Sequence, residues 1–335
     1  MTDFRLKKLI VLGVVTVVFA GLATGAVIWR AQQIQTQMPP APFLPGFSAQ
    51  VKNAQRIHIA SKAGSFDVAY SEGAGWTLPA KGNYPADFEQ VRHLLIGLAA
   101  LETIAPKTAR ADWLPFIGLD EPGNGTHIVV SDAHGVALAD IITGKTMPLG
   151  DGTGIFVRRG GETQSFLARA PYAPEPQLGP WLMQGVYSIN AARLMNVATP
   201  AVTVQREHTS DQNYGMTGVA TGKFNPTAVN GLAAAILDFA IADVRPVAAV
   251  DFAGARAITA RTFDGVILTM ALVQKPDGVW ARITASAVPG AVTAFRQEAD
   301  GIAARAAPWA YKLGPEQARA LMAGREEFLA PAGGQ

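Results

Sequence analysis

The sequence predicts an α+β protein: an N-terminal transmembrane helix followed by two similar units, each an antiparallel sheet with one packed helix. Three observations predict this class. One uncharged apolar run near the N-terminus is long enough to cross a bilayer. Short β-like segments, separated by glycine-containing turns, indicate strands of antiparallel sheets. Several motifs then recur in the same order later in the chain, which indicates an internal repeat.

Composition narrows the classes of function. The chain has 335 residues, enough for an anchor and two domains of ordinary size. Its formal net charge is +2 and no basic run follows Lys8, so we do not expect a nucleic-acid-binding protein. Because the sequence contains no cysteine, disulfides, thiolate metal sites and a cysteine nucleophile are excluded.

Residues 9–29 (LIVLGVVTVVFAGLATGAVIW) form an uncharged run of 21 residues, close to the roughly 20 that a membrane-spanning helix needs. The basic residues beside this run are Arg5, Lys7 and Lys8 before it and Arg30 after it. Because positively charged flanks stay inside, we expect residues 1–8 to form a cytoplasmic tail. The rest of the chain should then lie in the periplasm, as in a single-pass protein of a bacterial inner membrane.

A cleaved signal peptide is the alternative, with Ala23 and Gly25 as small residues before a cut. The apolar run is longer than the roughly 7 to 15 residues of a typical signal, which favours the anchor. Residues 30–47 then change from glutamine-rich to proline-rich. This composition predicts an extended linker that holds the folded part away from the bilayer.

The first α+β unit is predicted over residues 48–169. A helix is indicated where Pro85 and Asp87 supply helix-start signals and apolar residues recur at helical spacing from Val91 to Leu101. Asp132-Ala133-His134-Gly135 predicts a turn between two strands. The expected strands are Val51–Ala60, Ser65–Ser71, Trp76–Leu78, Thr126–Ser131, Val136–Thr143, Gly154–Arg159 and Thr163–Arg169.

A second copy of this unit is predicted over residues 185–330, after a proline-rich linker at residues 170–184. Its helix, Val229–Phe239, takes the place of Val91–Leu101, and a closing helix is expected over Pro315–Phe328. The matching motifs are Trp76-Thr77 with Met216-Thr217, Tyr84-Pro85-Ala86 with Phe224-Asn225-Pro226, Ala105-Pro106 with Arg245-Pro246, Val130–Lys145 with Ala260–Lys275, and the segments that begin at Gly154 and Gly278.

No residue pattern amounts to a catalytic signature, and we expect no cofactor, no metal and no enzymatic activity. The five histidines form no His-Glu-x-x-His arrangement, and the sequence has no nucleophile elbow of Gly-x-Ser-x-Gly form. The run Gly150–Gly154 lacks the Lys-Ser/Thr continuation of a phosphate loop, so it predicts a hairpin loop. Four carboxylates could pair for acid–base work on glycans, although turn and surface roles are favoured: Asp132, Asp140, Asp251 and Asp264.

Two apolar pairs lie in loop-like contexts and are the candidates for a partner surface. They are Trp113 with Phe116, and Trp181 with Leu182. Exposed aromatic residues of this kind mark many protein interfaces. Core packing is the alternative for both pairs, and the sequence alone leaves it open.

Further motifs are spread along the chain, and the resemblance they carry spans roughly residues 44–328. They are Phe43-Leu44-Pro45-Gly46-Phe47, Trp76 with Tyr84-Pro85-Ala86-Asp87, Leu94-Leu95 through Leu101, Phe116-Ile117-Gly118-Leu119-Asp120-Glu121-Pro122, and Trp309-Ala310-Tyr311. Together they resemble a bacterial family known as domain of unknown function (DUF) 4340. The resemblance implies association with ABC-type export machinery and brings no catalytic residues. Met216, where the second copy is expected to carry a tryptophan, departs from the repeat.

Two functions follow as hypotheses. The first is a membrane-anchored extracytoplasmic accessory or interaction subunit, with integral membrane subunits of an ABC-type transporter as partners. The alternative is a periplasmic enzyme acting on envelope glycans or lipids. A cleft holding several carboxylates or histidines with strongly perturbed pKa values would favour the enzyme, whereas an exposed apolar patch would favour the interaction subunit.

Overall fold

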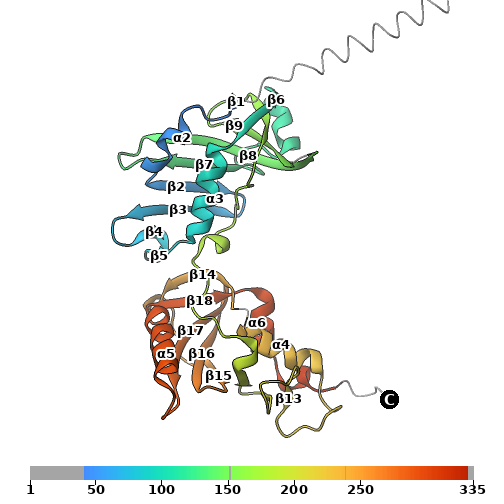
Figure 1. The fold of residues 1–335 in the computed structure, drawn as a ribbon. Coiled ribbons are helices and arrows are strands. Elements are labelled where there is room, and N and C mark those ends of the chain that lie inside the picture. The colour runs from blue at the N-terminus through green and yellow to red at the C-terminus, as the bar shows by residue number, and fades with distance from the viewer. Residues whose placement is uncertain (1–40, 151, 238, 331–335) are drawn as a thin grey trace, which may run out of the picture. The chain divides into compact units, whose positions relative to one another are not determined.

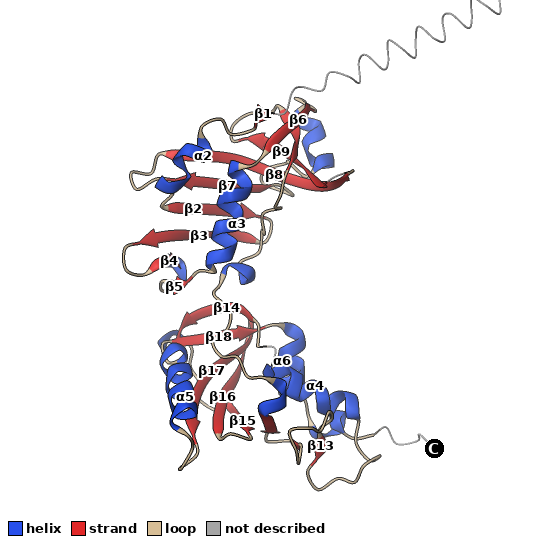
Figure 2. Cartoon of the chain, in the orientation of Figure 1, coloured by secondary structure: helices blue, strands red, loops and turns tan. Residues whose placement is uncertain are grey.

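The computed structural model describes residues 41–150, 152–237 and 239–330 (Figures 1 and 2). The predicted tail at residues 1–8, the predicted span at 9–29 and the linker up to residue 40 lie outside the described residues. Within the described ranges, no helix is both long and apolar enough to cross a membrane. The chain contains two antiparallel sheets, one of ten strands and one of eight, together with several helices.

The first sheet has the strand order β1-β6-β10-β9-β8-β7-β2-β3-β4-β5. Along β7 the residues alternate between buried and half-buried, as expected for an antiparallel strand with one packed face and one partly solvated face. Two helices occur in this part of the chain, α2 (Phe47–Gln50) and α3 (Phe88–Ala99). The strands are β1 (Ala41–Pro42), β2 (Arg56–Ser61), β3 (Gly64–Ser71), β4 (Gly75–Leu78), β5 (Tyr84–Pro85), β6 (Glu102–Pro106), β7 (Thr126–Ser131), β8 (Ala137–Leu149), β9 (Gly152–Arg159) and β10 (Ser165–Arg169).

The second sheet has the order β13-β12-β11-β15-β16-β17-β18-β14. Its helices are α4 (Pro226–Leu237), α5 (Thr293–Ala306) and α6 (Pro315–Met322). Helix α5 packs on β16 and β17, and α4 packs on β11, β12 and β13. The strands are β11 (Leu194–Ala198), β12 (Thr203–Gln205), β13 (Gly215–Met216), β14 (Ile241–Pro246), β15 (Arg256–Thr262), β16 (Val266–Lys275), β17 (Gly278–Ala287) and β18 (Trp309–Leu313).

The two sheets share one strand order, as the predicted repeat requires. The first sheet contains the run β4-β3-β2-β7-β8-β9-β10-β6, and the second reads β13-β12-β11-β15-β16-β17-β18-β14. Strands at equivalent places in the two sheets also follow one another in the same order along the chain. Counted along the chain, α3 and α4 both lie between the third and fourth strands of this shared set. Strands β1 and β5 are additions to the first sheet. Met216 lies buried in β13, the strand equivalent to the one that carries Trp76.

The expectation of one packed helix per unit is wrong. Helix α5 lies between β17 and β18, where the first copy has only a turn between β9 and β10. Its buried residues include only Ala299, Ile302 and Ala306, so its apolar stripe is too narrow to show clearly in the sequence. The closing helix is also shorter than predicted, because α6 ends at Met322 and a separate 3-10 segment follows at Arg325–Phe328.

Contacts between Cα atoms divide the described chain into two compact units. Unit 1 contains residues 41–54, 94–130 and 136–174; unit 2 contains residues 55–93, 131–135 and 175–330. Within unit 2, residues of the predicted linker 170–184 contact the strands of the first sheet. Leu182 forms a β-bridge with Ala86, and the Trp181 ring lies 5.9 Å from that of Phe66. The domain boundaries at 48–169 and 185–330 stay predictions.

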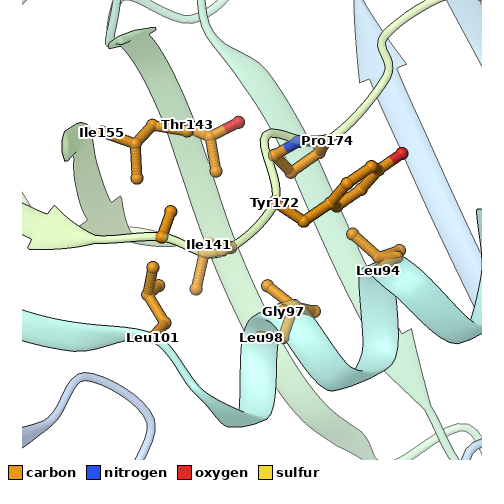
Figure 3. A pocket seen from close by; sticks show the side chains of 10 residues that line it. Leu94, Gly97, Leu98, Leu101, Ile141, Thr143, Ile155, Tyr172 and Pro174 are labelled. Carbon is orange, nitrogen blue, oxygen red and sulfur yellow. The ribbon is translucent and has the colours of Figure 1, made fainter. Parts of the chain in front are cut away.

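The interior of unit 1 is closely packed around the last turns of α3. Figure 3 shows Leu94, Leu98 and Leu101 beside Ile141 and Ile155 of the sheet, with Tyr172 and Pro174 on the neighbouring chain segment. The cavity between these side chains has a volume of about 10 Å³. This is roughly the space of one water molecule, so it offers no room for a ligand.

Residues 41–47, the C-terminal end of the predicted linker 30–47, contribute to the packing of unit 1. Phe43 and Phe47 are almost completely buried. Phe43 donates its backbone N–H to Leu101 (2.7 Å), and the guanidinium of Arg159 lies 4.8 Å from its ring centre. The Phe43 ring also lies 5.7 Å from that of Phe166, so it has a distant apolar partner that the local composition does not reveal. Within the described residues, the chain is therefore packed from β1 onward.

Candidate partner-binding groove

The candidate site is built on the segment that follows β6 in unit 1. The backbone N–H of Lys107 donates to the carbonyl of Ser165 (2.8 Å), which continues the pairing of β6 with β10. The hydroxyl of Ser165, fully buried, donates to the carbonyl of Thr108 (2.7 Å) and accepts from its N–H (3.0 Å). These three bonds fix the chain where it leaves the sheet, so the following residues project from a rigid base.

A 3-10 segment, Ala111–Ile117, then presents side chains in two directions. Leu114 points inward and forms a small core cluster with Leu119 and Ile142. Trp113 and Phe116 point outward, and 52% and 74% of their surfaces are exposed. The inward leucine therefore holds the segment in place, and the two aromatic residues are left on the surface.

Glycines allow this segment to cross β8 closely. A Cβ atom on Gly144 would lie 2.4 Å from the carbonyl oxygen of Ile117, closer than any real contact. Gly118 ends the segment with φ 71°, a left-handed conformation that glycine adopts without strain. The close crossing therefore depends on a glycine in each of the two chain segments.

Together these elements form an open groove of about 790 Å³, which we call the Trp113 groove. This volume is within the roughly 300–1,000 Å³ of typical ligand sites. Most of its lining area is apolar, contributed by exposed rings, by Met147 of β8 and by half-buried residues that pack on the core cluster. The residues used below are Lys107, Arg110, Trp113, Phe116, Met147 and Phe156.

The groove carries positive charge and no carboxylate among its described lining residues. Arg110 is partly neutralised by a forked ion pair with Asp112 (2.7 Å), and its guanidinium lies 5.3 Å from the centre of the Trp113 ring. Lys107 is exposed and forms no ion pair with a described residue. Lys145 is also exposed, and its stem lies close to Gly118 at the end of the 3-10 segment.

Trp181 and Leu182 are not part of any surface, which corrects that half of the prediction. Both side chains are fully buried. The indole N–H of Trp181 donates to the carbonyl of Glu175 (3.0 Å), so the polar atom of the ring is satisfied as well. The structure therefore brings Trp113 and Phe116 together in one groove, whereas Trp181 and Leu182 are core residues.

The predicted carboxylates do not converge. Asp132 accepts the N–H of His134 in a turn, and Asp251 accepts that of Ala253. Among the described residues, no group of three or more His, Asp or Glu side chains is placed to hold a metal ion.

His127 has both ring nitrogens engaged by carboxylates. Its Nδ1 lies 2.6 Å from Glu121 and its Nε2 lies 2.8 Å from Asp140. In this arrangement neither nitrogen is available as a base or as a metal ligand. Arg158, nearly buried, donates to the carbonyls of Leu119 and Glu162 beside this histidine. The cluster therefore holds the loop after the 3-10 segment onto the sheet.

Asp264 belongs to an ion-pair network in unit 2. Arg193 donates to Asp264 and to Glu298, with the closest approach to Glu298 at 2.7 Å. Burial alone would raise the pKa of Asp264, but hydrogen bonds from Arg193 and Thr262 hold that pKa below its ordinary value. The network joins the 3-10 turn Ala191–Arg193 before β11, helix α5 and the turn after β15, so its role is structural.

Sequence reasoning missed the basic and sulfur-containing side of the groove. Lys107 and Arg110 both lie within six residues before Trp113, a local signal that could have been used. Met147 and Phe156 come from distant strands, and nothing in their local sequence shows that they meet Trp113.

The fold and the groove together define the class of protein. It contains two antiparallel sheets of equivalent topology, helices that pack on the sheets, and an exposed apolar groove. A sequence model described as "Domain of unknown function (DUF4340)" matches residues 76–257, more than half of the chain, and the chain belongs to this family. No curated protein and no solved structure gives a significant match.

Proposed function

We propose that this protein acts by binding, as a membrane-anchored extracytoplasmic accessory subunit whose partners are integral membrane subunits of an ABC-type export system. The Trp113 groove is the surface that receives the partner. The membrane location rests on the apolar run at residues 9–29 and its basic flank, and the export partner rests on the family resemblance.

The exposure of Trp113 and Phe116 in one groove is the observation that carries the proposal. Removing a large aromatic side chain from water is favourable, so exposed aromatic rings such as these can contribute free energy of binding. Clusters of them are typical of the centres of protein interfaces. Met147, 38% exposed, adds a flexible apolar surface that can adapt to a partner. Such a groove can therefore supply binding energy without further rearrangement of the chain.

The register of β1 also supports a partner near the membrane. Ala41 pairs with Thr103 and Pro42 with Glu102, so the two strands run in opposite directions. Of the two residues of β1, Ala41 therefore lies nearer the end of β6 at which Pro106 leads into the groove. Residues 30–40 can span at most roughly 40 Å. If the span at 9–29 is in the bilayer, this limit keeps β1 within reach of its surface.

Affinity purification of the full-length protein from detergent-solubilised membranes tests the proposal. The double variant Trp113→Glu and Phe116→Glu should lose transporter subunits that the wild type retains, because charge is placed where apolar contact is needed. The matched control is Phe88→Glu with Val292→Glu, which changes two residues that are exposed outside the groove. All three proteins should melt at similar temperatures.

Two results would contradict the proposal. One is a wild-type protein that retains no transporter subunit under these conditions. The other is a groove variant that retains its partners as well as the control does.

A further inference from the structure

We infer that the Trp113 groove receives an amphipathic segment of the partner protein, with apolar side chains against Trp113, Phe116 and Met147 and with carboxylates beside Lys107 and Lys145. This inference rests on the proposed function, because it names the chemistry of the partner at the same site. Neither the exposure of the aromatic residues nor the charge of the groove alone would identify that chemistry.

The apolar part of the groove is shaped to receive side chains from outside. Its floor includes Phe156 and Ile117, which are half-buried and pack on the core cluster of Leu114, Leu119 and Ile142. Its walls are Trp113 and Phe116 on the 3-10 segment and Met147 on β8. A hollow with a fixed apolar floor suits a segment whose apolar residues follow one stripe, as in helix-in-groove recognition.

The positive charge of the groove determines which charged residues the bound segment should carry beside its apolar stripe. Lys107 lines the groove and Lys145 lies beside Gly118, and neither has an acidic partner among the described residues. Arg110 already shares its charge with Asp112. An unpaired lysine in the groove lining and a second one at the end of the 3-10 segment favour carboxylates and disfavour cationic segments.

A protein segment fits these observations better than the surface of an anionic bilayer. A bilayer-binding site needs apolar side chains that protrude beyond their surroundings so that they can enter the lipid. Here the apolar area includes a recessed floor, Phe156 and Ile117, that a flat lipid surface would leave uncovered. The partner must therefore supply side chains that project into the groove.

The test uses full-length protein in nanodiscs of zwitterionic lipid and two fluorescent synthetic peptides. Both peptides are amphipathic helices with the same stripe of leucine and phenylalanine, flanked by glutamate in one and by lysine in the other. Fluorescence anisotropy should show that the glutamate peptide binds about tenfold more tightly than the lysine peptide. Its affinity should fall as salt is added. Empty nanodiscs give the background.

Charge reversal provides the decisive comparison. The variant Lys107→Glu with Lys145→Glu should invert the preference, so that the lysine peptide binds more tightly. Reversal at two exposed lysines away from the groove, Lys52→Glu with Lys62→Glu, should leave the preference unchanged. An inverted preference in an otherwise folded protein would be difficult to obtain from general destabilisation.

The outcomes separate this inference from the proposed function. Equal binding of both peptides, or binding of neither, overturns the inference; if transporter subunits still co-purify in a groove-dependent way, the proposed function stands. A third outcome also overturns it: adding phosphatidylglycerol to the nanodiscs protects Trp113 from an aqueous quencher while neither peptide binds. That result would assign the groove to lipid.

Discussion

At the scale of single residues, Trp113 and Trp181 show how far local sequence determines burial. Both lie near a proline in a loop-like context: Trp181 directly follows Pro180, and Trp113 lies two residues before Pro115. Trp113 is half exposed, whereas Trp181 is fully buried against Phe66, a residue distant in the sequence. Because the burying surface comes from another part of the chain, the local pattern cannot distinguish the two tryptophans. The sequence therefore predicts Trp113 and Phe116 as surface residues, but on the same grounds it also predicts Trp181 and Leu182, which belong to the core.

Replacement of these tryptophans by alanine should have very different effects on stability. Trp181→Ala should lower the free energy of unfolding by about 3–5 kcal/mol, because it leaves a large cavity and removes a satisfied indole N–H. Trp113→Ala should change it by no more than about 0.5 kcal/mol. Urea unfolding of the full-length protein in detergent, followed by circular dichroism, measures both. Similar losses in the two variants would show that Trp113 is a core residue.

The ion pair of Asp264 makes a pH-dependent contribution to stability. Its carboxyl pKa is lowered in the folded protein, so the contribution is fully present above the ordinary pKa of about 3.9. It is lost as the pH falls through the lower folded pKa. Asp264→Asn should therefore cost about 2 kcal/mol near neutral pH, and its difference from the wild type should shrink in acid.

Denaturant unfolding near pH 7 and near pH 3 measures this difference. Asp251→Asn is the matched control, because an asparagine at that turn can still accept the N–H of Ala253. A gap between the wild type and Asp264→Asn that widens in acid would contradict the assignment.

At the scale of elements, the groove depends on the close crossing of the 3-10 segment and β8. Gly144→Ala should lower stability by roughly 1–3 kcal/mol and should also weaken partner binding, because the new methyl group displaces Ile117. Gly231→Ala is the control: this glycine lies in α4 with open space at the Cβ position, and alanine there should stabilise by roughly 0.5–1 kcal/mol. Thermal melting and co-purification measure the two effects, and a Gly144→Ala protein with unchanged partner binding would show that the crossing does not shape the groove.

Helices and strands could be predicted where apolar residues recur with one regular spacing along the local sequence. The strand expected at Thr126–Ser131 is β7 with the same bounds, and the turn at Asp132–Gly135 closes with the expected backbone hydrogen bond. The helices α3 and α4 lie within a few residues of their predicted positions. The short strands β1 and β5 were missed, because two residues carry no periodic signal and are defined only by their partners in the sheet.

At the scale of the whole molecule, the repeat was the strongest sequence signal. Motif matches such as Ala105-Pro106 with Arg245-Pro246 correspond to the ends of β6 and β14, which occupy equivalent places in the two sheets. A proline that ends a strand leaves a mark in both copies, because it cannot donate to the ladder. The position of α5 was not predictable from the repeat, since an insertion has no counterpart in the other copy.

The topology of the whole chain is the last prediction. Arg5, Lys7 and Lys8 precede the apolar run at residues 9–29, and the positive-inside rule then places the N-terminus in the cytoplasm and both sheets outside. Alkaline phosphatase folds only outside the cytoplasm, so its fusion after Gln335 should be active. A fusion after Lys8, before the run, is the control and should be inactive. An inactive fusion after Gln335, together with an active cytoplasmic reporter at the same position, would reverse the orientation. In that case the groove would meet a partner on the cytoplasmic side, and the extracytoplasmic role would be excluded.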